Sequence, residues 1–598
     1  MTAPNRNALW AETIVDELAA AGIEAAAVAP GSRSTPLVVA LDAHPEVTVF
    51  SHLDERAAAF FALGRGRKGR PTAVVTTSGT ATANLHPAVM EADRGRVPLV
   101  ALTADRPPEL RDSGANQTAD QTDLYGDAVR FGRRLPEPAP DARKLRSLRT
   151  TVDRALAAAI GDPAGPVHLN VPFAKPLEPV EVPGDVPDDL DETAPLAAGG
   201  RDGPFVRTTR GRPELDAGTL DAVADAVANA DRGLIVAGPA DPRSGTAGGG
   251  DEGPGPYGGE VAALARTLGW PLLADPLSGL RFGPHVAGTP VMGGYDAYLD
   301  RAAASWPDPD VVVRFGASPT SKPLRHYLRD VDARQFLVDP AGGWREAEFT
   351  ATDLLAADPA GVAAALRERI DGDAPVSAEW RRRFEAAETV HWETVEGHRD
   401  DLFEGGLLAD VASLAPDPAT VFVSNSMPVR DLDRFGRPRE ADLTVLGNRG
   451  VSGIDGVTST ALGAGSATDD PLVLVTGDLA YYHDMNGLLA LDRYGVDATV
   501  VLVNNDGGGI FHMLPIEEFD PPFTGQFKTP HGLDFEPTGD LYDLDFERVA
   551  DRDTFRERFG AVVGDGTTVL EVATDAERSH RTRENLQDAV AERVFEDG

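Results

Sequence analysis

The sequence predicts an α/β fold made of three doubly wound domains with mainly parallel sheets. The first observation behind this prediction is that short apolar, β-branched runs alternate with helical segments along most of the chain. The second is the length, because 598 residues exceed what one hydrophobic core usually supports and suggest about three or four domains. The third is that polar residues follow many of these runs, as they do at the carboxyl ends of parallel strands, where ligands bind.

Composition divides the chain into four segments: an N-terminal domain over residues 1–190, a linker over 191–212, a central domain with trailing helices over 213–400 and a C-terminal domain over 401–598. The linker ends a stretch rich in Pro, Asp and Gly that begins near Leu177. Arg243–Gly259 is Gly-rich and of low complexity, so we expect a loop in solvent. Glu517–Leu544 is long and acidic and contains aromatic residues, which is typical of a lid.

Charge and composition exclude several classes of protein. The net charge is −39, and the acidic residues are spread along the whole chain, as in proteins from a high-salt cytoplasm. This charge argues against a nucleic-acid partner, because a phosphate backbone needs a basic surface. No apolar run approaches the roughly 18–20 residues of a membrane span, and the N-terminus does not resemble a signal peptide. With no cysteine either, we expect a cytoplasmic protein without membrane insertion.

Polar residues follow two neighbouring strands expected at Leu472–Val475 and Ala498–Val503, with helical spacing over Asp484–Leu491 between them. Asp478 follows the first strand, and Asn505 follows the second 27 positions later. A carboxylate, a side-chain amide and a main-chain carbonyl form a hard oxygen site that suits Mg²⁺ and phosphate oxygens.

Three further residues complete this predicted site. Gly507 can offer its carbonyl in a tight turn, and the helix that starts with Leu479 and Ala480 directs its positive end at phosphates. Gly-Asp or Asn-Asn alone is more often turn chemistry, but the pair at this spacing predicts a metal–diphosphate site.

Gly477-Asp478 followed by Asn504-Asn505 resembles the motif of thiamine diphosphate (ThDP)-dependent enzymes, and the three domains resemble the ThDP-dependent decarboxylase architecture over essentially the whole chain. The resemblance implies ThDP with Mg²⁺ or Mn²⁺, held by Asp478, Asn505 and Gly507. It also implies cofactor contacts from three further residues: Ser426, Ile454 and Ile510. Of these, Ile454 matches the bulky residue that supports the bent cofactor.

The other mark of this family is a glutamate in the N-terminal domain, and Glu55 in His52–Arg56 fits that position. The resemblance implies that Glu55 is catalytic and hydrogen-bonds the cofactor's aminopyrimidine, a role that suits a buried Glu with a raised pKa. Glu55 alone also fits an exposed glutamate at a helix N-terminus. Because the family places this glutamate and the metal motif at one cofactor across a subunit interface, the resemblance implies a homodimer or homotetramer.

Six motifs narrow the resemblance within the family: PGSRSTP at 30–36, HLDER at 52–56, TADRPPEL at 103–110, ANQ at 115–117, SNSMPVR at 424–430 and NRGVSGIDG at 448–456. The member that they resemble is a transferase of menaquinone biosynthesis. By this resemblance the chain decarboxylates 2-oxoglutarate and adds the resulting succinyl semialdehyde unit to isochorismate.

Both substrates carry carboxylates, which guanidinium groups bind as bidentate forks. The predicted substrate-binding residues are Ser32, Arg33, Arg106, Asn116, Gln117, Lys322, Arg430, Arg449, Phe511 and Leu514. We expect the four arginines to face one crevice, although any one of them could instead be a surface ion-pair partner. Pro323 stands where some relatives have a second basic residue after Lys322.

Two alternatives remain from the sequence. Another ThDP carboligase, such as an acetolactate synthase, would keep Glu55, Asp478 and Asn505 but would leave the four arginines unexplained. A catalytically silent ThDP-fold subunit would not need an intact Glu55 and metal motif. Gly248–Gly253 fits Gly-x-Gly-x-x-Gly, but it does not directly follow a strand and its acidic pair would repel a pyrophosphate, so FAD is not expected.

Overall fold

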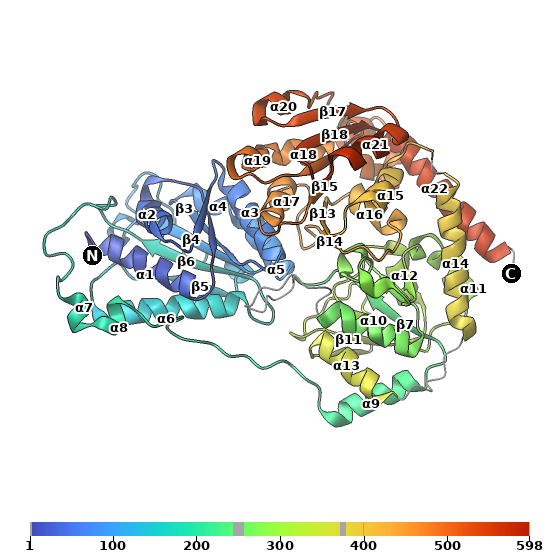
Figure 1. Ribbon diagram of the computed structural model, residues 1–598, viewed down its shortest axis with the longest axis horizontal. Coiled ribbons are helices and arrows are strands. Elements are labelled where there is room, and N and C mark those ends of the chain that lie inside the picture. Colours follow the sequence, from blue (N-terminus) through green and yellow to red (C-terminus); the bar gives the residue numbers. More distant parts are fainter. Residues whose placement is uncertain (1–2, 243–255, 371–377, 399, 597–598) are drawn as a thin grey trace.

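A computed structural model describes residues 3–242, 256–370, 378–398 and 400–596 and shows three α/β domains (Figure 1). Each domain contains one six-stranded sheet, and every strand pairing within these sheets is parallel. The fold class predicted from the sequence is therefore confirmed. Among the described helices, none is both long enough and apolar enough to cross a membrane.

The first domain, at the left of Figure 1, has the strand order β2-β1-β3-β4-β6-β5. Its strands are β1 (Ala25–Val28), β2 (Thr48–Ser51), β3 (Thr72–Thr76), β4 (Leu99–Asp105), β5 (Phe131–Arg134) and β6 (Pro166–Pro172). Its helices are α1 (Arg6–Ala20), α2 (Thr35–Ala43), α3 (Glu55–Arg67), α4 (Thr80–Ala83), α5 (His86–Arg94), α6 (Ala142–Ala159), α7 (Leu190–Thr193) and α8 (Pro195–Ala198).

The middle domain has the order β12-β11-β10-β7-β8-β9, the arrangement of dinucleotide-binding folds. Its strands are β7 (Gly233–Ala237), β8 (Leu272–Ala274), β9 (Val291–Met292), β10 (Val311–Phe315), β11 (Arg334–Val338) and β12 (Asp353–Leu355). Its helices are α9 (Ala217–Ala228), α10 (Pro256–Leu268), α11 (Leu299–Ser305), α12 (Lys322–Asp330), α13 (Pro359–Arg369) and α14 (Ala378–Glu396).

The third domain has the order β14-β13-β15-β16-β18-β17, which repeats the strand order of the first domain. Its strands are β13 (Ala419–Val423), β14 (Leu443–Leu446), β15 (Leu472–Gly477), β16 (Thr499–Asn504), β17 (Asp545–Val549) and β18 (Thr568–Ala573). Its helices are α15 (Glu404–Leu414), α16 (Met427–Phe435), α17 (Val457–Gly465), α18 (Asp478–Asp484), α19 (Leu489–Tyr494), α20 (Pro537–Tyr542), α21 (Arg552–Val562) and α22 (Ala576–Glu596).

The first and third domains meet along helices α3 and α17, which lie against each other in Figure 1. A Cβ atom added to Gly64 would lie 2.0 Å from the carbonyl oxygen of Thr460. One added to Gly463 would lie 2.0 Å from the carbonyl oxygen of Phe61. Glycine on both helices therefore lets their backbones approach more closely than any side chain would allow.

The structure differs from the sequence-based expectations in several segments. The expected solvent loop Arg243–Gly259 is wrong at its end, because α10 begins at Pro256; residues 243–255, including Gly248–Gly253, lie outside the described residues. The start of the expected linker 191–212 is helical, and Ala197 of α8 is buried in the core of the first domain. The helix expected over Asp484–Leu491 is instead two helices, α18 and α19, separated by a 3₁₀ turn. Glu517–Leu544 contains short helical turns and α20 rather than only loop.

Candidate active site

Asp478 is the first residue of α18, immediately after β15. Its Oδ1 accepts a hydrogen bond from the Leu479 nitrogen at 2.7 Å. Its Oδ2 accepts from the main-chain nitrogens of Gly507 at 2.9 Å and Asn505 at 3.2 Å. Burial raises the pKa of this carboxyl above its usual range. The structure thus brings together the residues that the sequence pairs across 27 positions.

The two polar atoms of the Asn505 side-chain amide have different surroundings. Its Nδ2 donates to Glu404 Oε1 at 2.7 Å, while its Oδ1 is buried and has no hydrogen-bond partner among the described residues. Gly507 has φ 136°, and a Cβ there would lie 2.0 Å from the carbonyl oxygen of Lys528, so only glycine fits. A buried carboxylate, an unpartnered amide oxygen and a main-chain carbonyl are a donor set that fits Mg²⁺.

His531 was not expected at this end of the site. Its Nε2 lies 3.2 Å from Asp478 Oδ2, and its Nδ1 lies 3.5 Å from Asp506 Oδ1. The sequence offers no spacing signal for this histidine, because it reaches Asp478 from the long segment after the metal motif.

Glu55 begins helix α3 because Asp54 caps that helix, accepting from the main-chain nitrogens of Arg56 at 2.7 Å and Ala57 at 3.3 Å. Its carboxylate accepts from Asn84 Nδ2 at 3.2 Å and is only partly buried within one chain. The strand-to-helix position predicted for Glu55 is therefore observed, but the single chain does not enclose it.

Two arginines of the first domain form a cationic pair at the carboxyl end of its sheet. Arg33 is buried and donates to the Phe173 carbonyl at 2.7 Å, and Arg106 donates to the Asn116 carbonyl at 3.0 Å. Burial and the neighbouring Arg106 lower the pKa of the Arg33 guanidinium. In the described part of the chain, the Nε atoms of both arginines are buried without a hydrogen-bond partner. This geometry fits an anion.

The polar residues predicted beside these arginines lie at the surface. Ser32, Asn116 and Gln117 are exposed, and Gln117 has φ 53°. Its side chain donates to the Ser78 carbonyl at 3.2 Å, after strand β3. These positions place Gln117 on the same sheet edge as Arg33.

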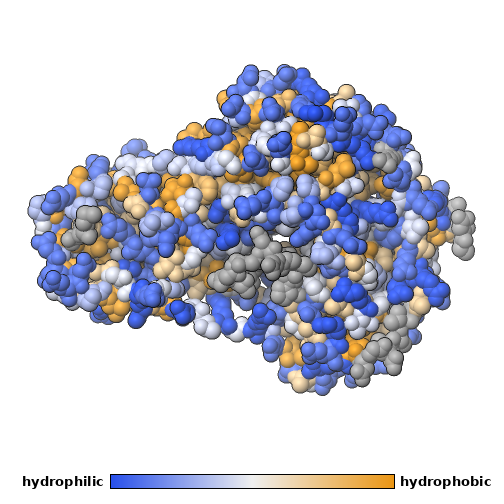
Figure 2. Space-filling view, in the orientation of Figure 1, coloured by the Kyte–Doolittle hydropathy of each residue, from blue (hydrophilic) through white to orange (hydrophobic). Residues whose placement is uncertain are grey.

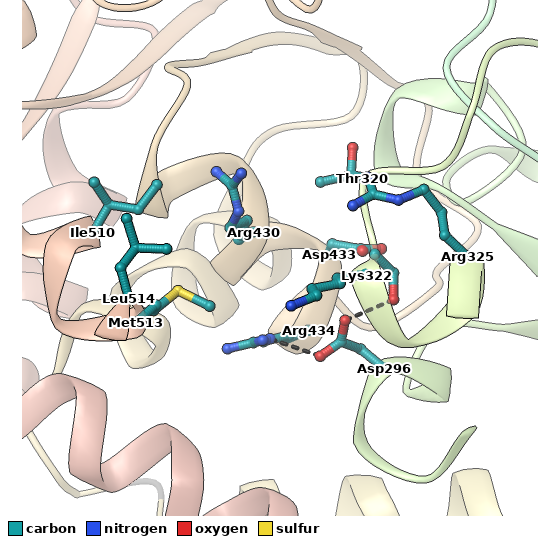
Figure 3. Close-up of a pocket in the computed structure, with 11 residues that line it drawn as sticks. Asp296, Thr320, Lys322, Arg325, Arg430, Asp433, Arg434, Ile510, Met513 and Leu514 are labelled. Atoms are coloured by element: carbon teal, nitrogen blue, oxygen red, sulfur yellow. Dashed lines mark hydrogen bonds and ion pairs between the residues drawn. The ribbon is translucent and has the colours of Figure 1, made fainter. Parts of the chain in front are cut away.

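A cavity of about 160 Å³ lies between the middle and third domains (Figure 3). It is lined by Asp296, Thr320, Ser321, Lys322, Arg325, Arg430, Asp433, Arg434, Ile510, Met513 and Leu514. In Figure 3, Ile510, Met513 and Leu514 form an apolar side, and the cations of α12 and α16 lie across from it. Four of these residues were predicted from the sequence: Lys322, Arg430, Ile510 and Leu514. Phe511, also predicted, belongs to the same turn, but its ring packs against Phe527.

Positive charge is concentrated in this cavity. Burial, together with Arg449, Arg434 and Arg325 nearby, lowers the pKa of Arg430 to about 10, so it remains cationic at neutral pH. Arg434 is compensated, because its Nε lies 2.7 Å from Asp296 Oδ1. Within the described residues, no carboxylate lies within ion-pair distance of Lys322, Arg430 or Arg449. The cavity therefore fits an anionic ligand.

The segments that carry Arg430 and Arg449 are joined through Asn425. Arg449 donates to Asn425 Oδ1 at 2.9 Å, and Asn425 Nδ2 donates to the carbonyl of Ser452 at 2.7 Å. Arg430 donates to the Ser426 carbonyl at 2.5 Å, and Ser426 has φ 71°, a conformation that is uncommon for non-glycine residues. Ile454, on the loop after Arg449, is 37% exposed in the single chain.

Within one chain the predicted residues form two groups. Glu55, Arg33 and Arg106 lie on the first domain, while the metal residues and the cavity belong to the middle and third domains. No hydrogen bond or ion pair among the described residues joins the two groups. The expectation that all four arginines face one crevice is therefore not met inside a single chain.

Sequence reasoning missed Arg325, Arg434 and Asp296 in the cavity. Arg325 and Arg434 each lie within four residues of a predicted cation, on the same helix as Lys322 or Arg430. Helical spacing from those cations is the signal that would have found both arginines.

The fold and these two groups define a thiamine pyrophosphate enzyme. Family models match in order along the chain: "Thiamine pyrophosphate enzyme, N-terminal TPP binding domain" at residues 10–124, "Middle domain of thiamine pyrophosphate" at 252–423 and "Thiamine pyrophosphate enzyme, C-terminal TPP binding domain" at 432–572. The chain belongs to the family of 2-succinyl-5-enolpyruvyl-6-hydroxy-3-cyclohexene-1-carboxylate (SEPHCHC) synthases.

Curated relatives of that name cover the whole chain. The SEPHCHC synthase of Halobacterium salinarum is 64% identical over 595 residues, covering 99% of each chain. That of Haloarcula marismortui is 63% identical over 607 residues, covering 100% of each, and that of Roseiflexus sp. is 46% identical, covering 96% of each. The solved ThDP-dependent 4-hydroxybenzoylformate decarboxylase of Rhodococcus jostii RHA1 shares the fold, with a TM-score of 0.69 at 17% identity over 95% of this chain and 99% of that chain.

Proposed function

We propose that the chain decarboxylates 2-oxoglutarate in a ThDP-dependent reaction and adds the succinyl semialdehyde unit to isochorismate, releasing CO₂, in menaquinone biosynthesis. The observation that carries this proposal is the 64% identity, over 99% of both chains, to a protein named SEPHCHC synthase. The cavity supports it, because Lys322 and Arg430 line it and supply positive charge for substrates that carry carboxylates, with Arg449 near Arg430.

In this proposal Asp478, Asn505 and Gly507 hold Mg²⁺ or Mn²⁺, and Leu479 and Ala480 lie beside the cofactor's diphosphate. When bound, ThDP supplies at its thiazolium carbon the electron sink that decarboxylation requires. Glu55 shares a proton with the aminopyrimidine ring nitrogen. The remaining predicted contacts to the cofactor are made by Ser426, Ile454 and Ile510.

The substrate carboxylates are assigned to the arginines. Arg430 and Arg449, with Lys322, bind carboxylates from the cavity side, and Phe511 and Leu514 help to exclude water. Arg33 and Arg106 bind isochorismate, with neutral hydrogen bonds from Ser32, Asn116 and Gln117. The buried, unpartnered Nε atoms of Arg33 and Arg106 support this assignment, because an anion would satisfy them.

This assignment requires a homodimer or homotetramer. Glu55 is only partly buried and is not joined to the metal residues within one chain. A two-fold axis would bring the first-domain group of one subunit to the metal and cavity of its partner. Ile454 and Glu55 would then become buried at the completed site.

The test is an assay of the purified protein with 2-oxoglutarate, isochorismate, ThDP and Mg²⁺, followed by CO₂ detection and mass spectrometry of the product. We expect CO₂ and SEPHCHC in equal amounts, and neither when ThDP is omitted. Pyruvate in place of 2-oxoglutarate serves as the matched control for a different carboligase. CO₂ release without consumption of isochorismate would contradict the assignment of the acceptor, and no CO₂ release at all would favour a silent subunit.

A further inference from the structure

A buried ion cluster lies directly behind the predicted metal ligand Asn505. Arg583, on the C-terminal helix α22, donates through Nε to Asp431 Oδ1 at 2.7 Å and through NH2 to Asp431 Oδ2 at 2.6 Å. The same NH2 group donates to Glu404 Oε2. All three side chains are buried, so their charges are compensated within the cluster rather than by water.

The second oxygen of Glu404 reaches the metal end. Glu404 Oε1 accepts from Asn505 Nδ2 at 2.7 Å and from Thr574 Oγ1 at 3.3 Å. Both Glu404 oxygens accept hydrogen bonds, Oε2 from Arg583 and Oε1 from Asn505 and Thr574, so the NH₂ group of Asn505 faces Glu404. The amide oxygen then faces the opposite way, and it is this Oδ1 that is buried without a partner among the described residues.

We propose that Glu404 is a positioning residue for the metal: it fixes the Asn505 amide so that Oδ1, and not the NH₂ group, faces the cation. The inference rests on the metal site of the proposed function and adds a residue to it. An amide turned the other way would present two N–H donors to a cation and would bring Oδ1 against a carboxylate. Outer partners that orient metal ligands typically change metal affinity about 10–100-fold when they are replaced.

Arg583 makes this orientation stable. Because its guanidinium binds Glu404 and Asp431 together, the Glu404 side chain is held in place and cannot turn away from Asn505. Asp431 lies on α16 beside Arg430, so one arginine of the C-terminal helix joins the metal ligand to the helix of the cavity cations.

The experiment measures Mn²⁺ binding to the full-length protein with ThDP, by electron paramagnetic resonance of free and bound Mn²⁺. We expect Glu404→Gln to weaken Mn²⁺ binding about 10–100-fold, because a Gln side chain no longer dictates the direction of the Asn505 amide. Asp410→Asn is the matched control. Asp410 is buried and lies on α15, the helix that carries Glu404, but it pairs with Arg552 of α21 and does not contact Asn505. It should bind Mn²⁺ as the wild type does.

A second arm tests orientation directly. In an Asn505→Asp background the ligand is a symmetric carboxylate with nothing to orient, so adding Glu404→Gln should not weaken Mn²⁺ binding further. If Glu404→Gln does not fold by circular dichroism, Glu404→Asp, which withdraws the acceptor by one methylene, replaces it with the same expected loss.

Wild-type Mn²⁺ affinity in a folded Glu404 variant, or an equal loss in Asp410→Asn, would overturn the proposal. A different result would show that the proposed metal site is itself wrong. In that case Asp478→Ala would also bind Mn²⁺ like the wild type.

Discussion

Glu91, on helix α5 of the first domain, accepts a hydrogen bond through Oε2 from the main-chain nitrogen of Val451 in the third domain, at 2.6 Å. The same buried carboxylate accepts from the nitrogens of Gly450 and Ser452, each at 2.9 Å, and is paired with Arg67 at 2.6 Å. The loop held in this way lies between Arg449 and Ile454. A carboxylate of the first domain therefore holds in place a loop of the third domain in the same chain, next to Arg449 and Ile454, for which binding roles are proposed.

We expect Glu91→Gln to raise the KM for 2-oxoglutarate about tenfold with a smaller change in kcat. A neutral amide has one acceptor oxygen where the loop needs two, and hydrogen bonds to charged groups are worth about 1.5–3 kcal/mol. Steady-state kinetics measure the effect, and Glu192→Gln, at an exposed position of α7, is the control. An unchanged KM would mean that the loop keeps its position without the carboxylate.

Arg33→Ala and Arg106→Ala should each lower kcat/KM for isochorismate about ten- to a hundredfold, because a charge-assisted contact of about 1.5–3 kcal/mol is lost. Decarboxylation of 2-oxoglutarate without isochorismate should change little. Lysine should rescue poorly, since an ammonium does not reproduce the guanidinium fork. Pre-steady-state assays with and without isochorismate separate the two steps. Wild-type kcat/KM in both variants would favour another carboligase.

Two inactive variants should restore activity when they are combined in one dimer. Glu55→Gln removes an acid–base group worth about 10²-fold or more, and Asp478→Ala removes a metal ligand. A mixed dimer has one site with both lesions and one site with neither, so the isolated mixed dimer should show about half of the wild-type rate and a random mixture about a quarter. Co-expression with two affinity tags isolates the mixed species. Inactive mixed dimers would show that both residues act within one chain.

Salt should stabilise the protein. The net charge is −39, and Figure 2 shows hydrophilic side chains spread over the visible faces of all three domains. Raising KCl from about 0.1 M to 1 M shortens the Debye length from about 10 Å to 3 Å and screens this self-repulsion. We expect Tm to rise over that range in thermal scans. A Tm that stayed constant over this range would contradict the interpretation of the acidic surface as suited to high salt.

His168 should make part of the stability dependent on pH. Burial lowers its pKa from 6.5 to about 4. Its Nε2 is 2.7 Å from Thr103 Oγ1, which itself donates to Asn170, so His168 is a neutral donor there. Below pH 6.5 the imidazole is protonated in the unfolded chain but stays neutral in the folded chain. The contribution of His168 to the free energy of unfolding is therefore complete above pH 6.5 and is lost as the pH falls toward 4.

The measurement compares the free energy of unfolding of the wild type and His168→Gln by urea titration between pH 7.5 and 4.5. Gln keeps a donor for Thr103 but does not titrate, so the wild type should lose more stability than the variant on acidification. Parallel curves for the two proteins would show that His168 titrates normally in the folded chain.

The sequence predicted the long buried strands well, because runs such as Leu472–Val475 are continuously apolar and are followed closely by Gly477 and Asp478. It missed β5 and β17, the edge strands of the first and third sheets, whose exposed or charged residues give no apolar run. The repeated strand order of those two sheets also left no visible repeat in the sequence, because strand order depends on which strands pair and not on which residues they contain.

The metal residues were predictable because two strand ends and a fixed spacing mark them. Glu91 and Glu404 were not, because their partners lie 359 to 361 and 101 positions away in the chain and a buried acid has no local signature. The separation of Glu55 from the metal residues was implied only by the family resemblance, since the sequence does not state which chain completes a site.

The glycine contacts between α3 and α17 also restrict how the enzyme can move. With backbone against backbone at Gly64 and Gly463, there is no room for an added side-chain atom between the two helices, so we expect the first and third domains to move together. Any opening that admits substrate or releases product should then take place elsewhere. The middle domain, which faces the cavity through Lys322 and Thr320, and the segment after Gly507 remain as the parts that could swing.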